Sequence, residues 1–121
     1  MSSSVQFERS VLVVDDDVEC ATALARMLGR IGFCVDVAWG AAEARDGLEH
    51  SVGVLEIELA GDCGVTLAFD LLASGRVNHV VFFTKSRDAP ALAAARAAAP
   101  VFSKLEGTEP LIRMLQALCC E

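Results

Sequence analysis

The feature that most constrains the fold is an apolar run over residues 11–14 that leads directly into three aspartates, Asp15, Asp16 and Asp17. Three of the four apolar residues are valine, and the run is too short for a buried helix, which predicts a strand buried on both faces. Carboxylates are costly to bury in such a core, so we expect them to emerge at the carboxyl end of the strand. Open α/β sheets place their ligand sites at that edge.

Adjacent carboxylates repel one another unless a cation lies nearby, so we expect either a metal ion or a lysine beside these three aspartates. Asp17 is also a candidate N-cap for the helix that should follow, because an aspartate side chain can accept a hydrogen bond from a free amide of the first turn. A helix needs only one such cap, so capping does not account for Asp15 and Asp16.

Length and composition indicate one globular domain. The chain has 121 residues, of which 54% are hydrophobic and 22% charged, which is too apolar for a disordered protein. We expect residues 1–9 to form a disordered lead-in, without the pattern of a signal peptide, and residues 10–121 to form the domain. No apolar run reaches the length of a membrane span, so we expect a cytoplasmic location and no membrane partner. The net charge of −7 argues against direct binding to nucleic acid.

The cysteines and histidines give no sign of a metal or redox site. The five cysteines lack metal-type spacing, and an odd number cannot all pair within one chain, so we expect reduced thiols. His50 and His79 lack ligand spacing too, and we expect both to be structural.

Apolar runs alternate with segments of helical periodicity along the whole chain. The predicted strands cover residues 11–14, 33–38, 53–57, 79–83 and 101–103. The predicted helices cover residues 18–28, 41–49, 65–74 and 89–99, and a fifth follows Thr108. This alternation predicts an α/β fold, with a doubly wound, five-stranded parallel sheet and right-handed crossovers. Asp36 interrupts the second strand, which predicts that this strand lies at an edge.

Polar residues stand at the ends of four of these strands, and parallel strands bring their carboxyl ends to the same edge of a sheet. They are Asp15 and Asp16 after the first strand, Glu56 in the third, Thr84 after the fourth and Lys104 after the fifth. Carboxylate oxygens suit Mg²⁺, while a hydroxyl and an ammonium can hold phosphoryl oxygens. The pattern predicts a site for magnesium and a phosphoryl group at this edge.

These motifs resemble those of the receiver domains of bacterial two-component response regulators, over roughly residues 11–118. The resemblance rests on residues 11–17, 38–44 and 56–64, together with Thr84 and Lys104. It implies the flavodoxin-like strand order 2-1-3-4-5 and a role in phosphorelay signalling rather than as an enzyme. In such domains the third-strand aspartate takes a phosphoryl group from a histidine kinase, beside a magnesium ion. The magnesium ligands that the resemblance implies are Asp16, Glu56 and the backbone carbonyl of Glu58.

The chain departs from the receiver pattern around the signalling site. Glu56 stands where the family has the phosphoaccepting aspartate. The other departures are Ala60 and Leu105 in place of prolines, Val101 in place of the aromatic switch residue, and Lys85 in place of a small residue. The core pattern stays intact, which is typical of a degenerate receiver, or pseudo-receiver.

Glutamate carries its carboxylate one methylene further out than aspartate, a displacement of about 1.5 Å. A misplacement of about 1 Å can slow a reaction about 100-fold, so we predict that Glu56 is not phosphorylated at a useful rate. In one hypothesis, Glu56 mimics a phosphate and keeps the domain permanently on. In the other, it pairs with Lys104 or Lys85, and the domain is a fixed docking module that needs no metal. The missing ring at Val101 favours the docking module, because a switch needs a bistable element.

The sequence allows two ways to neutralise Asp15, Asp16 and Glu56: a shared divalent ion or a nearby lysine.

The helix predicted over residues 89–99 is nearly all alanine, so its outer face is a candidate partner surface. Receivers often bind partners through helix four, strand five and helix five, which implies a kinase, an output domain, another signalling protein or a second copy of the chain. A small enzyme or flavin carrier on the same fold is disfavoured. No Gly-rich loop follows the first strand, and no nucleophile stands near a base.

Overall fold

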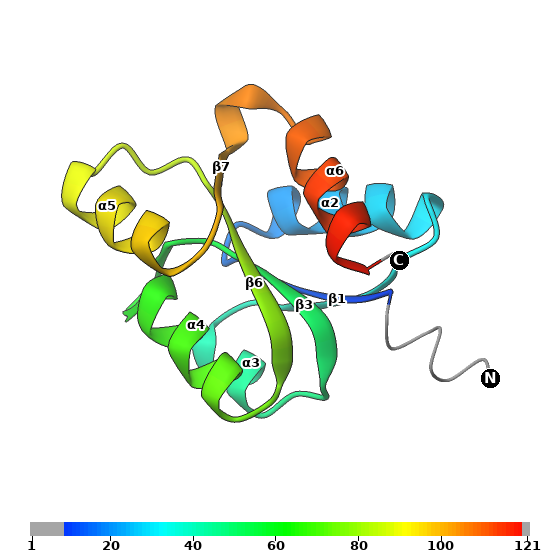
Figure 1. Ribbon diagram of the computed structural model, residues 1–121, viewed down its shortest axis with the longest axis horizontal. Helices are drawn as coiled ribbons and strands as arrows, with labels where there is room; N and C mark the ends of the chain where they lie inside the picture. Colours follow the sequence, from blue (N-terminus) through cyan, green and yellow to red (C-terminus); the bar gives the residue numbers. More distant parts are fainter. Residues whose placement is uncertain (1–8, 120–121) are drawn as a thin grey trace.

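The computed structural model describes residues 9–119 as a five-stranded parallel sheet with helices on both faces (Figure 1). The sheet contains β1 (Ser10–Val14), β2 (Cys34–Ala38), β3 (His50–Leu55), β6 (Val77–Thr84) and β7 (Val101–Ser103). The helices are α2 (Val18–Arg30), α3 (Ala41–Arg45), α4 (Gly64–Ala73), α5 (Ala89–Ala98) and α6 (Glu109–Cys119). The strand order β2-β1-β3-β6-β7 corresponds to 2-1-3-4-5 along the chain, so the predicted fold class is confirmed.

The alternation of side chains along each strand divides the core into two layers. In β1, Leu12 and Val14 face one layer, and Val11 and Val13 face the other. Helices α3, α4 and α5 cover the first layer, and α2 and α6 cover the second (Figure 1). Burial of one such side chain contributes about 1.5–3 kcal/mol. A strand that is apolar at every position therefore gains this stabilisation fully only when both faces are covered.

The third strand begins earlier and ends earlier than the sequence predicted. It starts at His50 rather than residue 53, because its polar first residues find partners inside the fold. The amide of His50 donates to the carbonyl of Arg76, and the amide of Ser51 donates to the Ser10 hydroxyl at 2.9 Å. The strand ends at Leu55, so Glu56 lies just beyond its carboxyl end.

Two connections also differ from the prediction. Helix α3 ends at Arg45 rather than running to residue 49, because Gly47, a poor helix former, follows its last turn. The predicted loop over residues 60–64 contains part of a hairpin, β4 (Glu58–Leu59) with β5 (Asp62–Cys63). Gly61, at its turn, has φ +71°, a conformation that glycine adopts without strain.

The expected lead-in over residues 1–9 lies outside the described residues except for Arg9, and the domain boundary at residue 10 stays a prediction. Between residues 9 and 119, no helix combines the length and the apolar character needed to cross a bilayer.

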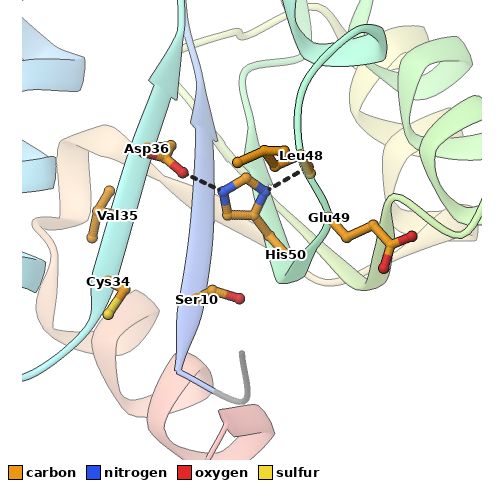
Figure 2. A pocket seen from close by; sticks show the side chains of 7 residues that line it. All are labelled: Ser10, Cys34, Val35, Asp36, Leu48, Glu49 and His50. Atoms are coloured by element: carbon orange, nitrogen blue, oxygen red, sulfur yellow. Dashed lines mark hydrogen bonds and ion pairs between the residues drawn. The ribbon is translucent and has the colours of Figure 1, made fainter. Parts of the chain in front are cut away.

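A buried histidine links the strands at the amino-terminal edge of the sheet (Figure 2). The Nε2 atom of His50 lies 2.8 Å from Oδ2 of Asp36 on β2, and its Nδ1 atom lies 3.0 Å from the carbonyl oxygen of Leu48. A hollow of about 490 Å³ lies beside this pair, away from the acidic residues that follow β1. His50 thus joins β3 to the edge strand β2 across β1, which is a structural role.

We expect His50→Ala to lower the free energy of unfolding by about 2–4 kcal/mol, because it removes a buried ring and both of its hydrogen bonds. Urea unfolding measures the change. The matched control is His79→Ala, at an exposed position, which should change stability by no more than about 0.5 kcal/mol. Equal effects of the two substitutions would contradict the role of His50.

Candidate functional site

Strand β1 delivers Asp15 to the carboxyl edge of the sheet as the first residue after its end. The amide of Asp15 donates to the carbonyl of Ala38 at 3.2 Å, which holds the backbone in line with β2. Its carboxylate is buried, and Oδ1 accepts a hydrogen bond from the amide of Asp17 at 3.0 Å. The other oxygen, Oδ2, lies 2.6 Å from Nζ of Lys104. Asp15 is therefore both a turn-forming residue and one half of a buried ion pair.

Strand β3 delivers Glu56 beside Asp15 in the same way. The amide of Glu56 donates to the carbonyl of Val14 at 3.0 Å, so the two acids follow neighbouring strands. Glu56 is 4% exposed, and its Oε1 atom lies 2.9 Å from Nζ of Lys104. Its Oε2 atom accepts hydrogen bonds from the amide of Ile57, at 2.7 Å, and from the hydroxyl of Thr84. Both carboxylate oxygens thus have partners within the chain.

Lys104 supplies the positive charge between these two carboxylates. It follows β7, and its side chain is 11% exposed. Burial lowers the pKa of the Lys104 ammonium, but the hydrogen bonds that it donates to Asp15 and Glu56 outweigh burial and raise this pKa above its ordinary value. Lys104 therefore stays charged at neutral pH, and the acid cluster, defined here as Asp15, Glu56, Thr84 and Lys104, contains one ammonium and two carboxylates.

Thr84 connects the acid cluster to the loop that follows β6. Its hydroxyl donates to Glu56 and accepts a hydrogen bond from the amide of Ser86 at 3.0 Å. The Ser86 hydroxyl in turn donates to Glu58 at 3.0 Å. Ser86 is not among the site residues predicted from the sequence. The available signal was a second hydroxyl two residues after Thr84, in the same loop.

Asp16 and Glu58 lie outside this buried network. Both are exposed, and Oδ2 of Asp16 accepts a hydrogen bond from the amide of Ala60 at 2.8 Å, which fastens the β4–β5 hairpin to the end of β1. Asp17 caps α2 through a hydrogen bond from the amide of Cys20, as predicted. Of the two lysines considered as partners for Glu56, Lys104 makes the ion pair, and Lys85 is exposed.

The side chains that the receiver resemblance implies as magnesium ligands, Asp16 and Glu56, already make hydrogen bonds or ion pairs within the chain. Within residues 9–119, no group of three or more His, Cys, Asp and Glu side chains is placed to hold a metal. The oxygens of Glu56 already accept from Lys104, Thr84 and an amide, and an Asp16 oxygen is used by Ala60. The ammonium of Lys104 provides the compensating charge that a cation would otherwise provide between Asp15 and Glu56.

Cys20 lies near the acid cluster at the start of α2. Burial raises the pKa of its thiol, and although nearby Lys104 lowers it, burial prevails. The Cys20 thiol is therefore protonated at neutral pH.

Gly64 allows the backbone after Glu56 to approach the first residue of α4. A Cβ atom at this position would lie 2.1 Å from the carbonyl oxygen of Glu56, and the Gly64 amide donates to the carbonyl of Ile57 at 2.7 Å. A side chain here would push the Glu56 backbone away from the position in which Lys104 and Thr84 contact its carboxylate.

Gly64→Ala should therefore lower the free energy of unfolding by about 1–3 kcal/mol or more through overpacking against backbone. Chemical unfolding measures the loss. The control is Gly29→Ala on α2, where a Cβ atom meets nothing within 4 Å and where alanine favours the helix by about 1 kcal/mol. A stable Gly64→Ala variant would contradict the close approach.

Lys104→Met should destabilise the protein by about 3 kcal/mol, because it leaves two buried carboxylates without their cation. The matched control is Lys85→Met at an exposed position. Because the folded-state pKa of Lys104 is raised, its contribution is complete below the ordinary value of 10.5 and declines as the pH rises beyond it. The stability difference between wild type and Lys104→Met should thus be constant from neutral pH to about pH 10 and shrink above it, as measured by thermal unfolding.

No protein-family model matches the sequence, and no curated protein matches it either. Solved structures do match the fold. The response regulator protein TrrA from Thermotoga maritima, solved in complex with Mg(2+)-BeF, has a TM-score of 0.79 at 21% sequence identity, over 91% of this chain and 98% of that one. The signal receiver domain of a modulated diguanylate cyclase from Desulfovibrio desulfuricans G20 has a TM-score of 0.77 at 25% identity, over 91% and 92%. The receiver domain of the Francisella response regulator 1452 has a TM-score of 0.77 at 19% identity, over 91% and 95%. The chain therefore has the fold of response-regulator receiver domains.

Proposed function

We propose that this chain is a degenerate receiver that signals by binding a protein partner, without being phosphorylated and without enzyme activity. The observation that carries the proposal is the pairing of Glu56, the residue that the receiver resemblance aligns with the phosphoaccepting aspartate. Its carboxylate is ion-paired to Lys104 and hydrogen-bonded by Thr84. The partner is a kinase, an output domain or another signalling protein, and we expect the work to take place in the cytoplasm.

Phosphoryl transfer to a carboxylate needs an oxygen that is free to attack in line with the leaving group. In Glu56, Oε1 lies 2.9 Å from the Lys104 ammonium, and Oε2 accepts from the Ile57 amide and from Thr84. An attack by either oxygen would therefore compete with a buried interaction that this oxygen already makes. The extra methylene of glutamate adds a geometric cost to this energetic one.

In the proposed state the acid cluster works without magnesium, because Lys104 neutralises it. The solved structure of TrrA contains Mg(2+)-BeF, and the alternative for this chain is a magnesium site at Asp16, Glu56 and the Glu58 carbonyl. Such a site would compete with the hydrogen bond from the Ala60 amide to Asp16 and with the ion pair between Lys104 and Glu56. These competing interactions support the metal-free form.

One observation favours a second candidate function, a receiver that is constitutively active. The carboxylate of Glu56 contacts both Thr84 and Lys104, the two groups that the receiver resemblance assigns to the outer phosphoryl oxygens. In this alternative, Glu56 acts as a built-in phosphate mimic. Both candidates share the prediction that Glu56 does not accept a phosphoryl group.

Incubation of the wild-type protein with Mg²⁺ and acetyl phosphate should give no gain of one phosphoryl mass, as measured by intact-protein mass spectrometry. The control variants are Glu56→Asp, which restores the shorter carboxylate, and Glu56→Gln, which has none. A gain in Glu56→Asp alone would identify the additional methylene as the block. A stable gain in wild type that disappears in Glu56→Gln would overturn both candidate functions.

A further inference from the structure

A cavity of about 240 Å³ lies next to the acid cluster, where α5 packs against β7 (Figure 1). Its walls come from α5, β7, the loop after β6 and the turn after β7. The lining residues are Thr84, Ser86, Leu92, Arg96, Val101, Ser103 and Glu106. Thr84 belongs to both the cavity and the acid cluster, because its hydroxyl donates to Glu56.

The size and lining of this cavity restrict what can occupy it. The volume is below the range of about 300–1,000 Å³ that small-molecule and cofactor pockets usually have, which favours a single side chain over a nucleotide or a flavin. Five of the seven lining residues are polar or charged, and Leu92 and Val101 are the two apolar ones. A group with an apolar body and a polar tip matches such a mixed lining, and tyrosine combines both on a rigid ring that is smaller than the indole of tryptophan.

Two opposite charges line the same cavity without neutralising each other. Arg96 on α5 and Glu106 after β7 are both exposed, and neither forms an ion pair with another residue in the described range 9–119. A guanidinium can lie over the face of an aromatic ring and attract it. Charges of opposite sign on a binding partner would find complements at Arg96 and Glu106.

We propose that this α5–β7 cavity receives one tyrosine side chain of a protein partner, with an acidic and a basic residue of the partner facing Arg96 and Glu106. The inference rests on the proposed function, since it assumes a protein partner, and it adds the chemistry that the partner presents. The ring lies against Leu92 and Val101 and within reach of the guanidinium of Arg96. Because Thr84 lines the cavity, the occupant touches the residue that holds Glu56 in place.

The test is a titration of the isotope-labelled full chain, followed by amide NMR. The probes are p-cresol, which is the tyrosine side chain alone, and the capped tripeptides Glu-Tyr-Lys and Lys-Tyr-Glu, with Glu-Ala-Lys as the matched control. We expect saturable shifts centred on Thr84, Leu92 and Val101 with p-cresol and with at least one tyrosine peptide, and none with the alanine peptide. Arg96→Ala should weaken binding of the tyrosine peptide about two- to five-fold, in line with the strength of a cation–π contact.

Val101→Phe and Leu92→Phe each fill the cavity, from β7 and from α5, and each should abolish the shifts. The amide spectrum shows whether a variant is folded, and either folded variant is sufficient for the comparison. The proposal is overturned by the lack of a saturable shift, by shifts centred elsewhere, or by shifts that persist in a folded, filled variant. The acetyl phosphate experiment tests only whether Glu56 is phosphorylated. The proposed function and the proposed tyrosine site can therefore be overturned separately.

Discussion

One ammonium shared by two buried carboxylates determines how the carboxyl edge of the sheet is built. Lys104 follows the edge strand β7, whereas Asp15 and Glu56 follow β1 and β3, so the ion pairs join parts of the sheet that are not neighbours. Buried charges cost more in desolvation than they return unless their remaining atoms are also paired. That condition holds here, because no buried side-chain nitrogen or oxygen in the described part of the chain lacks a hydrogen-bond partner.

Glu56 has a structural role in this arrangement, because it is one of the two carboxylates that share the Lys104 ammonium. The Glu56 carboxylate contacts Lys104 and Thr84 at once, while the Glu56 amide donates to the Val14 carbonyl. Through these contacts Glu56, which follows β3, is linked to Thr84 at the end of β6 and to Lys104 after β7. The close approach of Gly64 to the Glu56 carbonyl restricts the same segment from the other side.

Much of this arrangement was predictable because it follows from the period of the apolar pattern. The run over residues 11–14 indicated a doubly covered strand, and the parallel topology then required Asp15, Glu56, Thr84 and Lys104 to meet at one edge. The start of β3 was missed because His50 and Ser51 are polar, and only tertiary partners make their burial favourable. The hydrogen bond that turns the Asp16 side chain away from the acid cluster could not be predicted either, because the fold is what brings the Ala60 amide of the β4–β5 hairpin close to Asp16.

The two edges of the sheet differ in how they end. Strand β7 has three residues, and β2 carries Asp36, whose exposed carboxylate is paired with the buried ring of His50. Short strands and charged residues are the means by which natural sheets discourage the addition of foreign strands. Both edge strands are therefore poor templates for the addition of a strand from another molecule. The helices that cover the two faces of the sheet remain as the surfaces through which the domain can bind other molecules.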